Sequence, residues 1–223
     1  MKYQLIKSNR KTLAVCIDYT GKVIVKAPIN LSFDKINEFL IKKSNWIAKN
    51  QIYAQNRYQK YKNLYTYNEV MYKGKIIKCA FKNARKISIT SEQLLIPQKY
   101  QLPNKQNALK NALKRFLIQE SEKEFIIKLN KFSSSGFKYN SLKIINSKSK
   151  WGSCDKQGNI GLNFRAIMLP SVFLNYLIAH ELAHTIHFNH STKFWDIVRS
   201  LIPDCKNIRK ELKYFNFLQD LFR

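Results

Sequence analysis

The sequence of 223 residues predicts an α+β fold. Short runs in which apolar and polar side chains alternate fill much of residues 1–104, and a period of two is typical of half-buried strands. Beyond them, apolar residues recur mainly at the three- and four-residue spacing of helices. We therefore predict a β-rich N-terminal region with one helix at 1–104. A second region at 105–223 would hold a long helix, a β-hairpin, a helix packed on that small sheet and a C-terminal helix.

The N-terminal region starts with an alternating pattern over residues 11–27, and Gly21 at its centre predicts a hairpin turn. A helix is expected to begin near Ser32 or Asp34, because both residue types favour helix starts. Apolar residues follow at helical spacing, namely Ile36, Phe39, Leu40, Trp46 and Ile47. Residues 65–103 then return to short strand patterns.

The second region opens with apolar residues at i, i+3, i+4 and i+7 over residues 107–132, which predicts a long amphipathic helix with a buried stripe. The SSSG segment at 133–136 is expected to end it. Strand patterns at 141–150 and 159–167 flank a loop, WGSCDKQG, and a further helix is predicted to start at Pro170 and Ser171.

The composition indicates which partners and which cellular location to expect. The formal net charge is +26, but the basic residues are mostly lysines dispersed along the chain, so we expect at most non-specific nucleic-acid affinity and no dedicated nucleic-acid site. The four cysteines show no CxxC pair, which favours reduced thiols and a cytoplasmic location. No apolar run is long enough to span a membrane, and no membrane partner is expected. The oligomeric state is not indicated.

All four histidines fall within one stretch, HELAHTIHFNH, at residues 180–190. His180 and His184 are four residues apart, so they lie on one face of a helix and can share one metal ion. Glu181 stands beside the first histidine, where it can act on a water held by the metal rather than on the metal itself. This is the HExxH pattern, in which Zn²⁺ supplies Lewis acidity and the glutamate serves as general base.

The helix around these residues is apolar on nearly every face, which predicts that it is buried. Its apolar residues include Phe173, Leu174, Leu177, Ile178, Leu182 and Ile186. Unpartnered ionisable groups in such a helix would cost several kcal/mol, on the order of the penalty for burying a polar group, and a bound cation offsets that cost. A metal site is therefore favoured over a purely structural role for the histidines.

A catalytic zinc site needs a third protein ligand, and His190 is our choice. His187 is seven residues from His180, about 10.5 Å along a helix axis, which is too far for both to bind one ion. A chain reversal after the helix would bring His190 back, and Asn189 tolerates the left-handed backbone that such a reversal can need. A remote Glu or Asp is the remaining alternative.

The motif HELAHTIHFNHSTKFW resembles that of the YgjP-like metallopeptidase family, relatives of the SprT-like zinc proteases. The segment SKSKWGSCDKQGNIGLNFRAIMLP and the N-terminal SNRKTLAVCIDYTGKVIVKAP and NWIAKNQ are also similar to that family, so the resemblance covers residues 8–215. It implies a zincin-like catalytic half with His180, His184 and His190 as zinc ligands.

Further residues match the family pattern, and we interpret them as structural: Trp151, Gly152, Phe194 and Trp195. A glycine at 152 suits a tight turn, and the aromatics suit packing around the metal helix. Cys154 is predicted to be a buried thiol rather than a fourth ligand or a redox switch. The strand at Ile160–Asn163 is a candidate edge for binding an extended peptide.

Three functions follow from these features. The first is a zinc metallopeptidase that hydrolyses a protein or peptide substrate with Glu181 as general base. The second uses the same site as a nucleoside triphosphate (UTP) pyrophosphatase, an activity also attached to the family, and the positive charge suits it although a phosphate-binding glycine loop is absent. The third is a non-catalytic, DNA-associated module stabilised by metal, against which Glu181 argues because a structural site needs no base.

Overall fold

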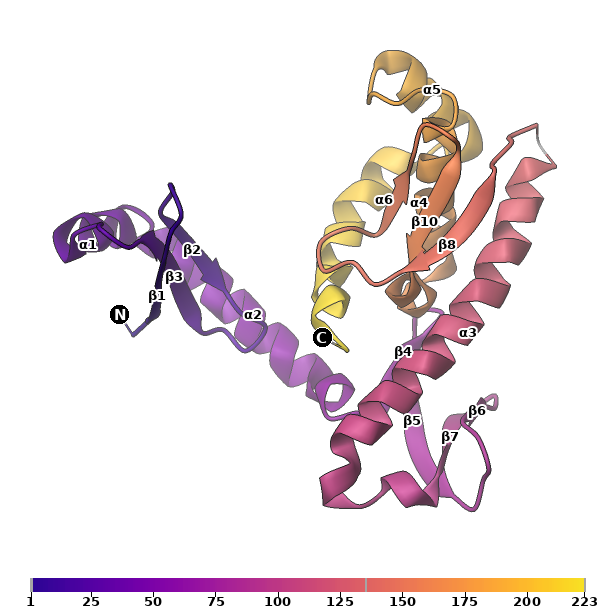
Figure 1. Cartoon of the computed structure of the whole chain (residues 1–223), viewed down its shortest axis with the longest axis horizontal. Helices are drawn as coiled ribbons and strands as arrows, with labels where there is room; N and C mark the ends of the chain where they lie inside the picture. The colour runs from indigo at the N-terminus through magenta and orange to yellow at the C-terminus, as the bar shows by residue number, and fades with distance from the viewer. Residues whose placement is uncertain (1, 135, 223) are drawn as a thin grey trace. The chain divides into compact units, whose positions relative to one another are not determined.

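The computed structural model describes residues 2–134 and 136–222 and confirms the α+β class (Figure 1). Contacts divide the chain into two compact units, one that ends at Lys62 and one that begins at Asn63. The region boundary at 104 that the sequence pattern suggests lies inside the second unit. The reason is that the turn at Lys73 and Gly74 donates backbone hydrogen bonds to Ile167 and Met168, which ties residues before 104 to residues after it.

The first unit contains a three-stranded sheet of β1 (Gln4–Ser8), β2 (Ala14–Ile17) and β3 (Val23–Pro28), in the order β1-β3-β2. β2 and β3 form the predicted antiparallel hairpin, with Gly21 at a φ of 90° in its turn. β1 was not predicted, and it pairs with β3 in parallel. The buried face of the sheet and the helices that follow share one core, made of Val23, Val25, Ala27, Ile36, Leu40 and Ile47.

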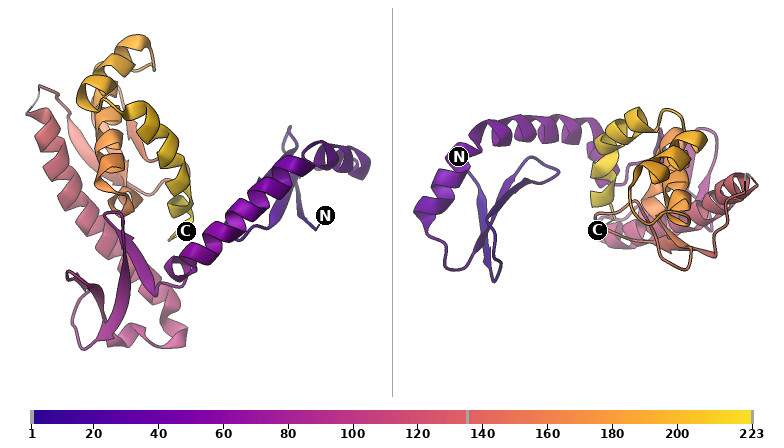
Figure 2. Two further views of the ribbon diagram at one scale, coloured as in Figure 1. Left: turned by 180° about the vertical axis from the view of Figure 1, so that it is seen from behind. Right: turned by 90° about the horizontal axis from the view of Figure 1, so that it is seen from above.

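Two helices, α1 (Phe33–Lys42) and α2 (Ser44–Tyr65), stand where the sequence predicts one. The Ser32 hydroxyl caps α1 by accepting a hydrogen bond from the Lys35 backbone N–H at 3.5 Å. The interruption is a single residue, Lys43, and α2 then continues as a long helix (Figure 2). Ile36, Leu40 and Ile47 are buried as predicted, whereas Trp46 is 46 % exposed.

The predicted short strands at 65–103 form a four-stranded sheet in the order β4-β5-β7-β6. Its strands are β4 (Glu69–Tyr72), β5 (Lys75–Lys82), β6 (Ser88–Ile89) and β7 (Gln93–Pro97). Gly74 in the β4–β5 turn has a φ of 82° and packs against Pro170, so closely that a Cβ there would lie 2.9 Å from the Pro170 Cα atom. The sheet is thus in contact with Pro170, which precedes a later helix. The short 3₁₀ helices η1 (Gln98–Tyr100) and η2 (Pro103–Lys105) follow it.

The long helix α3 (Gln106–Ser133) agrees with the predicted one and buries a stripe of side chains. A second three-stranded sheet follows, with β8 (Ser141–Ile145), β9 (Gly152–Cys154) and β10 (Asn159–Asn163) in the order β8-β10-β9. The predicted loop therefore contains a strand, β9, which forms a hairpin with β10. The expectation that β10 offers a free edge is wrong, because β10 is the central strand.

The chain then passes through η3 (Phe164–Met168) and α4 (Ser171–His184), and ends in α5 (Thr192–Leu201), α6 (Cys205–Leu212) and η4 (Lys213–Asp220), where the sequence suggests one helix. α4 is packed against β9 and β10, which confirms a small sheet on the HExxH helix (Figure 1). Most of its predicted apolar residues are buried. Ile186 is the exception at 51 % exposed, because α4 ends before it.

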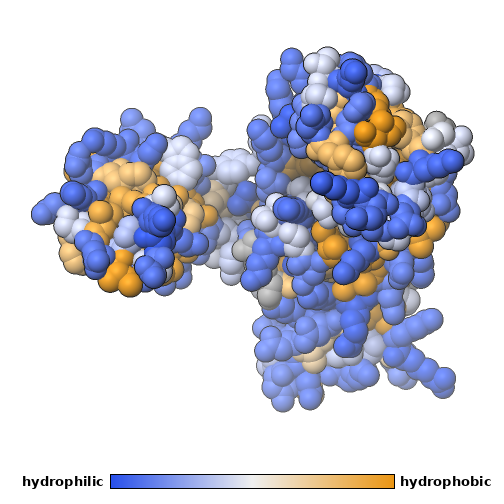
Figure 3. Space-filling model, turned by 45° about the horizontal axis from the view of Figure 1, so that its top comes forward, coloured by the Kyte–Doolittle hydropathy of each residue, from blue (hydrophilic) through white to orange (hydrophobic). Residues whose placement is uncertain are grey.

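Hydrophilic side chains cover most of the surface seen in Figure 3, with scattered apolar patches between them. None of the helices in the described part of the chain combines the length and the apolar character needed to cross a membrane.

Candidate metal centre

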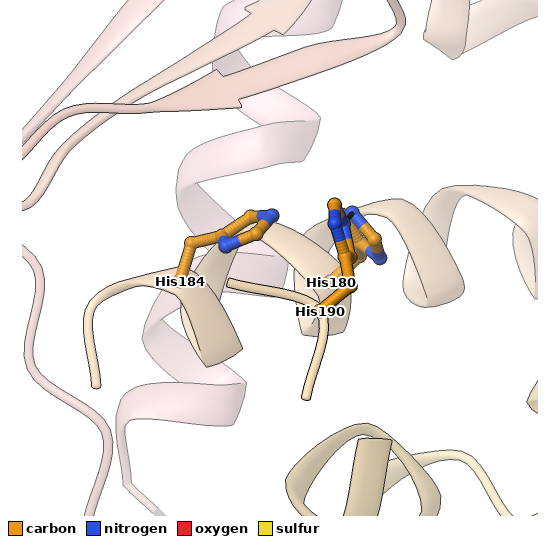
Figure 4. A group of neighbouring side chains, drawn as sticks. All are labelled: His180, His184 and His190. Atoms are coloured by element: carbon orange, nitrogen blue, oxygen red, sulfur yellow. Dashed lines mark hydrogen bonds between the residues drawn. The ribbon is translucent and has the colours of Figure 1, made fainter. Parts of the chain in front are cut away.

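The structure brings together His180, His184 and His190, with one ring nitrogen from each lying within 4.8 Å of the others. His180 and His184 project from α4, and His190 reaches the same place from the segment after the helix (Figure 4). The Nε2 atoms of His180 and His190 are 3.2 Å apart. The three residues predicted as ligands therefore form one group of nitrogen donors.

The segment after α4 reverses without a left-handed residue at its end. The backbone N–H groups of Ile186 and His187 both donate to the Ala183 carbonyl, so the chain turns immediately after the helix. Among the described non-glycine residues, positive φ angles occur only at Tyr67, Lys73 and Phe222. The role suggested for Asn189 is therefore not observed.

His187 contributes its backbone rather than its ring. Its side chain is outside the group of three, while its carbonyl oxygen lies 3.1 Å from Nδ1 of His184. Nδ1–H of His184 can donate to that carbonyl, which leaves Nε2 of the same ring free to bind a metal. An outer hydrogen bond of this kind is what typically orients a metal-binding histidine.

The distance between two of the three donors fits a metal such as zinc. Two imidazole nitrogens that each lie 2.0–2.1 Å from a tetrahedral ion are separated by about 3.3 Å, close to the observed Nε2–Nε2 distance of 3.2 Å. Burial, together with the neighbouring histidines, lowers the pKa of His180 to about 3, and burial also lowers the pKa of His184. Both rings are therefore neutral near pH 7, which is the form that binds metal.

Aromatic side chains of α5 support the three rings, as predicted. Phe194 is fully buried, and its ring centroid lies 4.5 Å from that of His184, 4.8 Å from His190 and 5.0 Å from His180. Trp195 stacks on His190 at 5.8 Å with an interplanar angle of 27°. These contacts limit the rotation of the rings and so keep the nitrogens converged.

Glu181 is only 5 % exposed and lies against strand β9. A Cβ atom at Gly152 would approach the carboxyl carbon of Glu181 to 2.7 Å, so the absence of a side chain at 152 makes the space for the carboxylate. The interpretation of Gly152 as a tight-turn residue is thus incorrect. Burial raises the pKa of Glu181 to about 8, with the charge of Lys150 opposing that rise.

A cavity of about 340 Å³ opens beside the histidines. Its lining includes His180, Glu181 and His190 together with other residues of β9, α4, α6 and η4. Three cationic residues also line it: Lys150, Arg209 and Lys213. Sequence reasoning missed these cations, because the lysine-rich composition gives no signal that distinguishes them from other basic residues.

Cys154 is half-buried and is not among the three residues that converge. Burial raises the pKa of its thiol to about 11, with the charges of Glu181 and Asp155 adding to the effect. The thiol is therefore protonated near neutral pH. The thiol is thus half-buried rather than buried as predicted, and it lies outside the histidine group.

Comparison with known proteins gives one result. Neither the curated proteins nor the solved structures provide a match, whereas the family model described as "YgjP-like, metallopeptidase domain" matches residues 11–215. That range covers most of the chain and includes the three histidines, Glu181 and Gly152. The chain therefore belongs to the YgjP-like metallopeptidase domain family.

Proposed function

We propose that this protein is a zinc-dependent metallopeptidase with His180, His184 and His190 as metal ligands and Glu181 as general base. The observation that carries the proposal is the position of Glu181, which shares one cavity with His180 and His190 and is held in a space that Gly152 leaves open. A base beside three converging nitrogens is the arrangement that hydrolysis with an activated water requires.

The roles of the individual residues follow from their contacts. Zinc, when bound, polarises the substrate carbonyl and makes water a stronger acid. His184 is oriented by the His187 carbonyl, and His190 by the Trp195 ring. In its ionised form Glu181 accepts the proton of the attacking water and returns it to the leaving amine, and the raised pKa makes this carboxylate a stronger base.

The peptide would bind along β9. This strand is at the edge of its sheet, and Gly152 within it contacts Glu181. An extended substrate can add to a sheet edge through backbone hydrogen bonds, which are independent of the substrate's sequence. In this arrangement the scissile bond would lie beside the carboxylate.

A second function has one observation in its favour. The cations in the cavity, Lys150, Arg209 and Lys213, suit a phosphate-bearing substrate, so zinc-dependent hydrolysis of UTP or a related nucleoside triphosphate is the alternative. A non-catalytic, DNA-associated role is less favoured, because it would not use the buried base.

The proposal also covers the affinity of the protein for nucleic acid and its location in the cell. The charge of +26 supports non-specific binding to nucleic acid through dispersed lysines. The four free cysteines suit a reducing compartment, and we propose a cytoplasmic location.

The proposal is tested by incubating the zinc-loaded protein with a denatured protein mixture and, in parallel, with a nucleotide panel that includes UTP. We expect new peptide termini in the first reaction and no release of pyrophosphate or phosphate in the second. The Glu181→Gln variant serves as the control, since it should be inactive in whichever reaction is genuine. Release of pyrophosphate without peptide cleavage would reverse the ranking.

A further inference from the structure

The cavity beside the metal centre has two chemically different walls. His180, Glu181 and His190 form the reactive wall. Lys150 precedes β9, and Arg209 and Lys213 lie on α6 and at the start of η4, so the cationic residues approach from two sides. Apart from Glu181, no acidic residue of the described chain lines this cavity.

Arg209 is the best positioned of the three cations. Its guanidinium carbon lies 4.9 Å from the centroid of the Trp195 ring, and Trp195 in turn stacks on His190. A guanidinium held on an aromatic face keeps its planar set of N–H donors oriented and available for a partner at its edge. The stack therefore fixes Arg209 relative to a proposed metal ligand.

None of the three cations forms an ion pair with an acidic residue in the described part of the chain. They line the same cavity as His180, Glu181 and His190. Cations that face a cavity without a protein counter-ion are typical of a site for an anionic ligand.

We propose that this cavity recognises a carboxylate of the peptide substrate, an acidic side chain close to the bond that is cleaved, with Arg209 as its main partner and Lys150 and Lys213 as supporting charges. The inference rests on the metallopeptidase function proposed above. The size of the cavity, about 340 Å³, suits a side chain or two rather than a folded domain. A guanidinium pairs with a carboxylate through two parallel hydrogen bonds, which explains why the fixed residue is an arginine.

Cleavage-site profiling tests the specificity directly. Wild-type protein, Arg209→Gln and Arg209→Lys would each digest a denatured protein mixture, and the new termini would be identified by mass spectrometry. We expect Glu and Asp to be enriched near the cleaved bond about tenfold for the wild type, a ratio in keeping with a charge-assisted hydrogen bond. The enrichment should disappear in Arg209→Gln and persist in reduced form in Arg209→Lys.

Lys210→Gln is the matched control, because Lys210 neighbours Arg209 on α6 and carries the same charge but does not line the cavity. It should keep the wild-type enrichment. Equal loss in Lys210→Gln and Arg209→Gln would show that only the overall charge matters, and this outcome would overturn the inference. Zinc content of each variant, measured in parallel, identifies a variant whose site is damaged.

A binding measurement keeps the inference separate from the activity. Full-length Glu181→Gln protein, zinc-loaded, would be titrated with two peptides that differ only in Glu against Gln, with tryptophan fluorescence as the signal. We expect the Glu peptide to bind about tenfold more tightly than the Gln peptide. This difference should vanish in a double variant that carries both Glu181→Gln and Arg209→Gln. If no peptide is cleaved but this difference is found, the proposed function fails and carboxylate recognition stands. Equal binding of both peptides, or displacement by inorganic phosphate with no preference for Glu, overturns it.

Discussion

The two three-stranded sheets have the same order of strands but serve different purposes. In both, the last strand lies in the centre, pairs in parallel with the first and forms an antiparallel hairpin with the second. In the central strand β3, buried residues alternate with half-buried or exposed ones, whereas β10 is buried along nearly its whole length. The central strand of one sheet therefore covers a core on a single face, and the central strand of the other is buried on both faces.

The hairpin partners differ in the same way. β2 presents half-buried apolar residues, and its neighbour β3 supplies Val23 and Val25 to an apolar core. β9 instead places Gly152 against the carboxylate of Glu181. The comparison teaches that two sheets with the same strand order can differ in what they bury, because a position without a side chain, Gly152, leaves room for a polar group.

The largest effect is expected from His190→Ala, which should disturb only the sheet of β8, β9 and β10 and the helix α4. Removal of one of three nitrogen donors should weaken zinc binding by more than the roughly 100-fold that loss of an outer-shell partner costs. Amide hydrogen exchange should then speed up in α4 and β9 and remain unchanged in β2 and β3. Zinc content and site-resolved exchange measure both parts.

His187→Ala is the control for that experiment, because only the backbone carbonyl of His187 contacts His184. It should retain zinc and normal exchange. Full zinc in His190→Ala with depleted zinc in His187→Ala would show that the ligands are assigned wrongly.

The next largest effect is expected from Glu181→Gln, which keeps the size of the buried side chain and all three nitrogens. Zinc should stay bound and both sheets should be intact, while turnover falls on the order of 10²–10⁴-fold, the usual contribution of a general base. Steady-state kinetics and metal analysis of the same preparation provide the test. An active Glu181→Gln enzyme would remove the proposed mechanism.

The smallest effect comes from a pair of glycine substitutions, one at each sheet. Gly152→Ala should displace the Glu181 carboxylate and reduce turnover by about 100-fold, as expected for a small misplacement of a catalytic group, with little loss of stability. Gly21→Ala places a Cβ at a φ of 90° in the other hairpin, which should lower the free energy of unfolding by about 1–3 kcal/mol and leave turnover unchanged.

Steady-state kinetics and denaturant unfolding of both variants measure the turnover that Gly152→Ala should lower and the stability that Gly21→Ala should lower. If Gly21→Ala reduced turnover as strongly as Gly152→Ala, the two sheets would not have separate roles.

The sequence predicts much of this fold where local pattern determines the structure. The β2–β3 hairpin, the long helix α3 and the start of α4 all follow from periodicity and from Gly21 or Pro170. The interruption at Lys43 and strand β1 were not predicted. The helix is interrupted at Lys43 although no helix-breaking glycine or proline is present there. Strand β1 acquires its partner only when β3 folds beside it in parallel.

In the candidate site, too, local spacing predicts some features, and others appear only when the chain is packed. Spacing along one helix predicts that His180 and His184 converge, and the structure brings His190, the predicted third ligand, to the same place. The role of Gly152 could not be predicted, since a glycine in a sequence does not reveal which distant group occupies its space. The cationic wall was missed for a similar reason: Lys150 and Arg209 are far apart in the chain and meet only through the packing of α6 and β9 around one cavity.

The contact between the β4–β5 turn and α4 has an evolutionary consequence. Gly74 packs on Pro170, the residue that precedes the metal helix, and Lys73 donates a backbone hydrogen bond to η3. An insertion in this turn would push the start of α4, and with it His180 and His184, which lie about three and four turns further along. Descendants of this chain must therefore inherit the four-stranded sheet and helix α4 together.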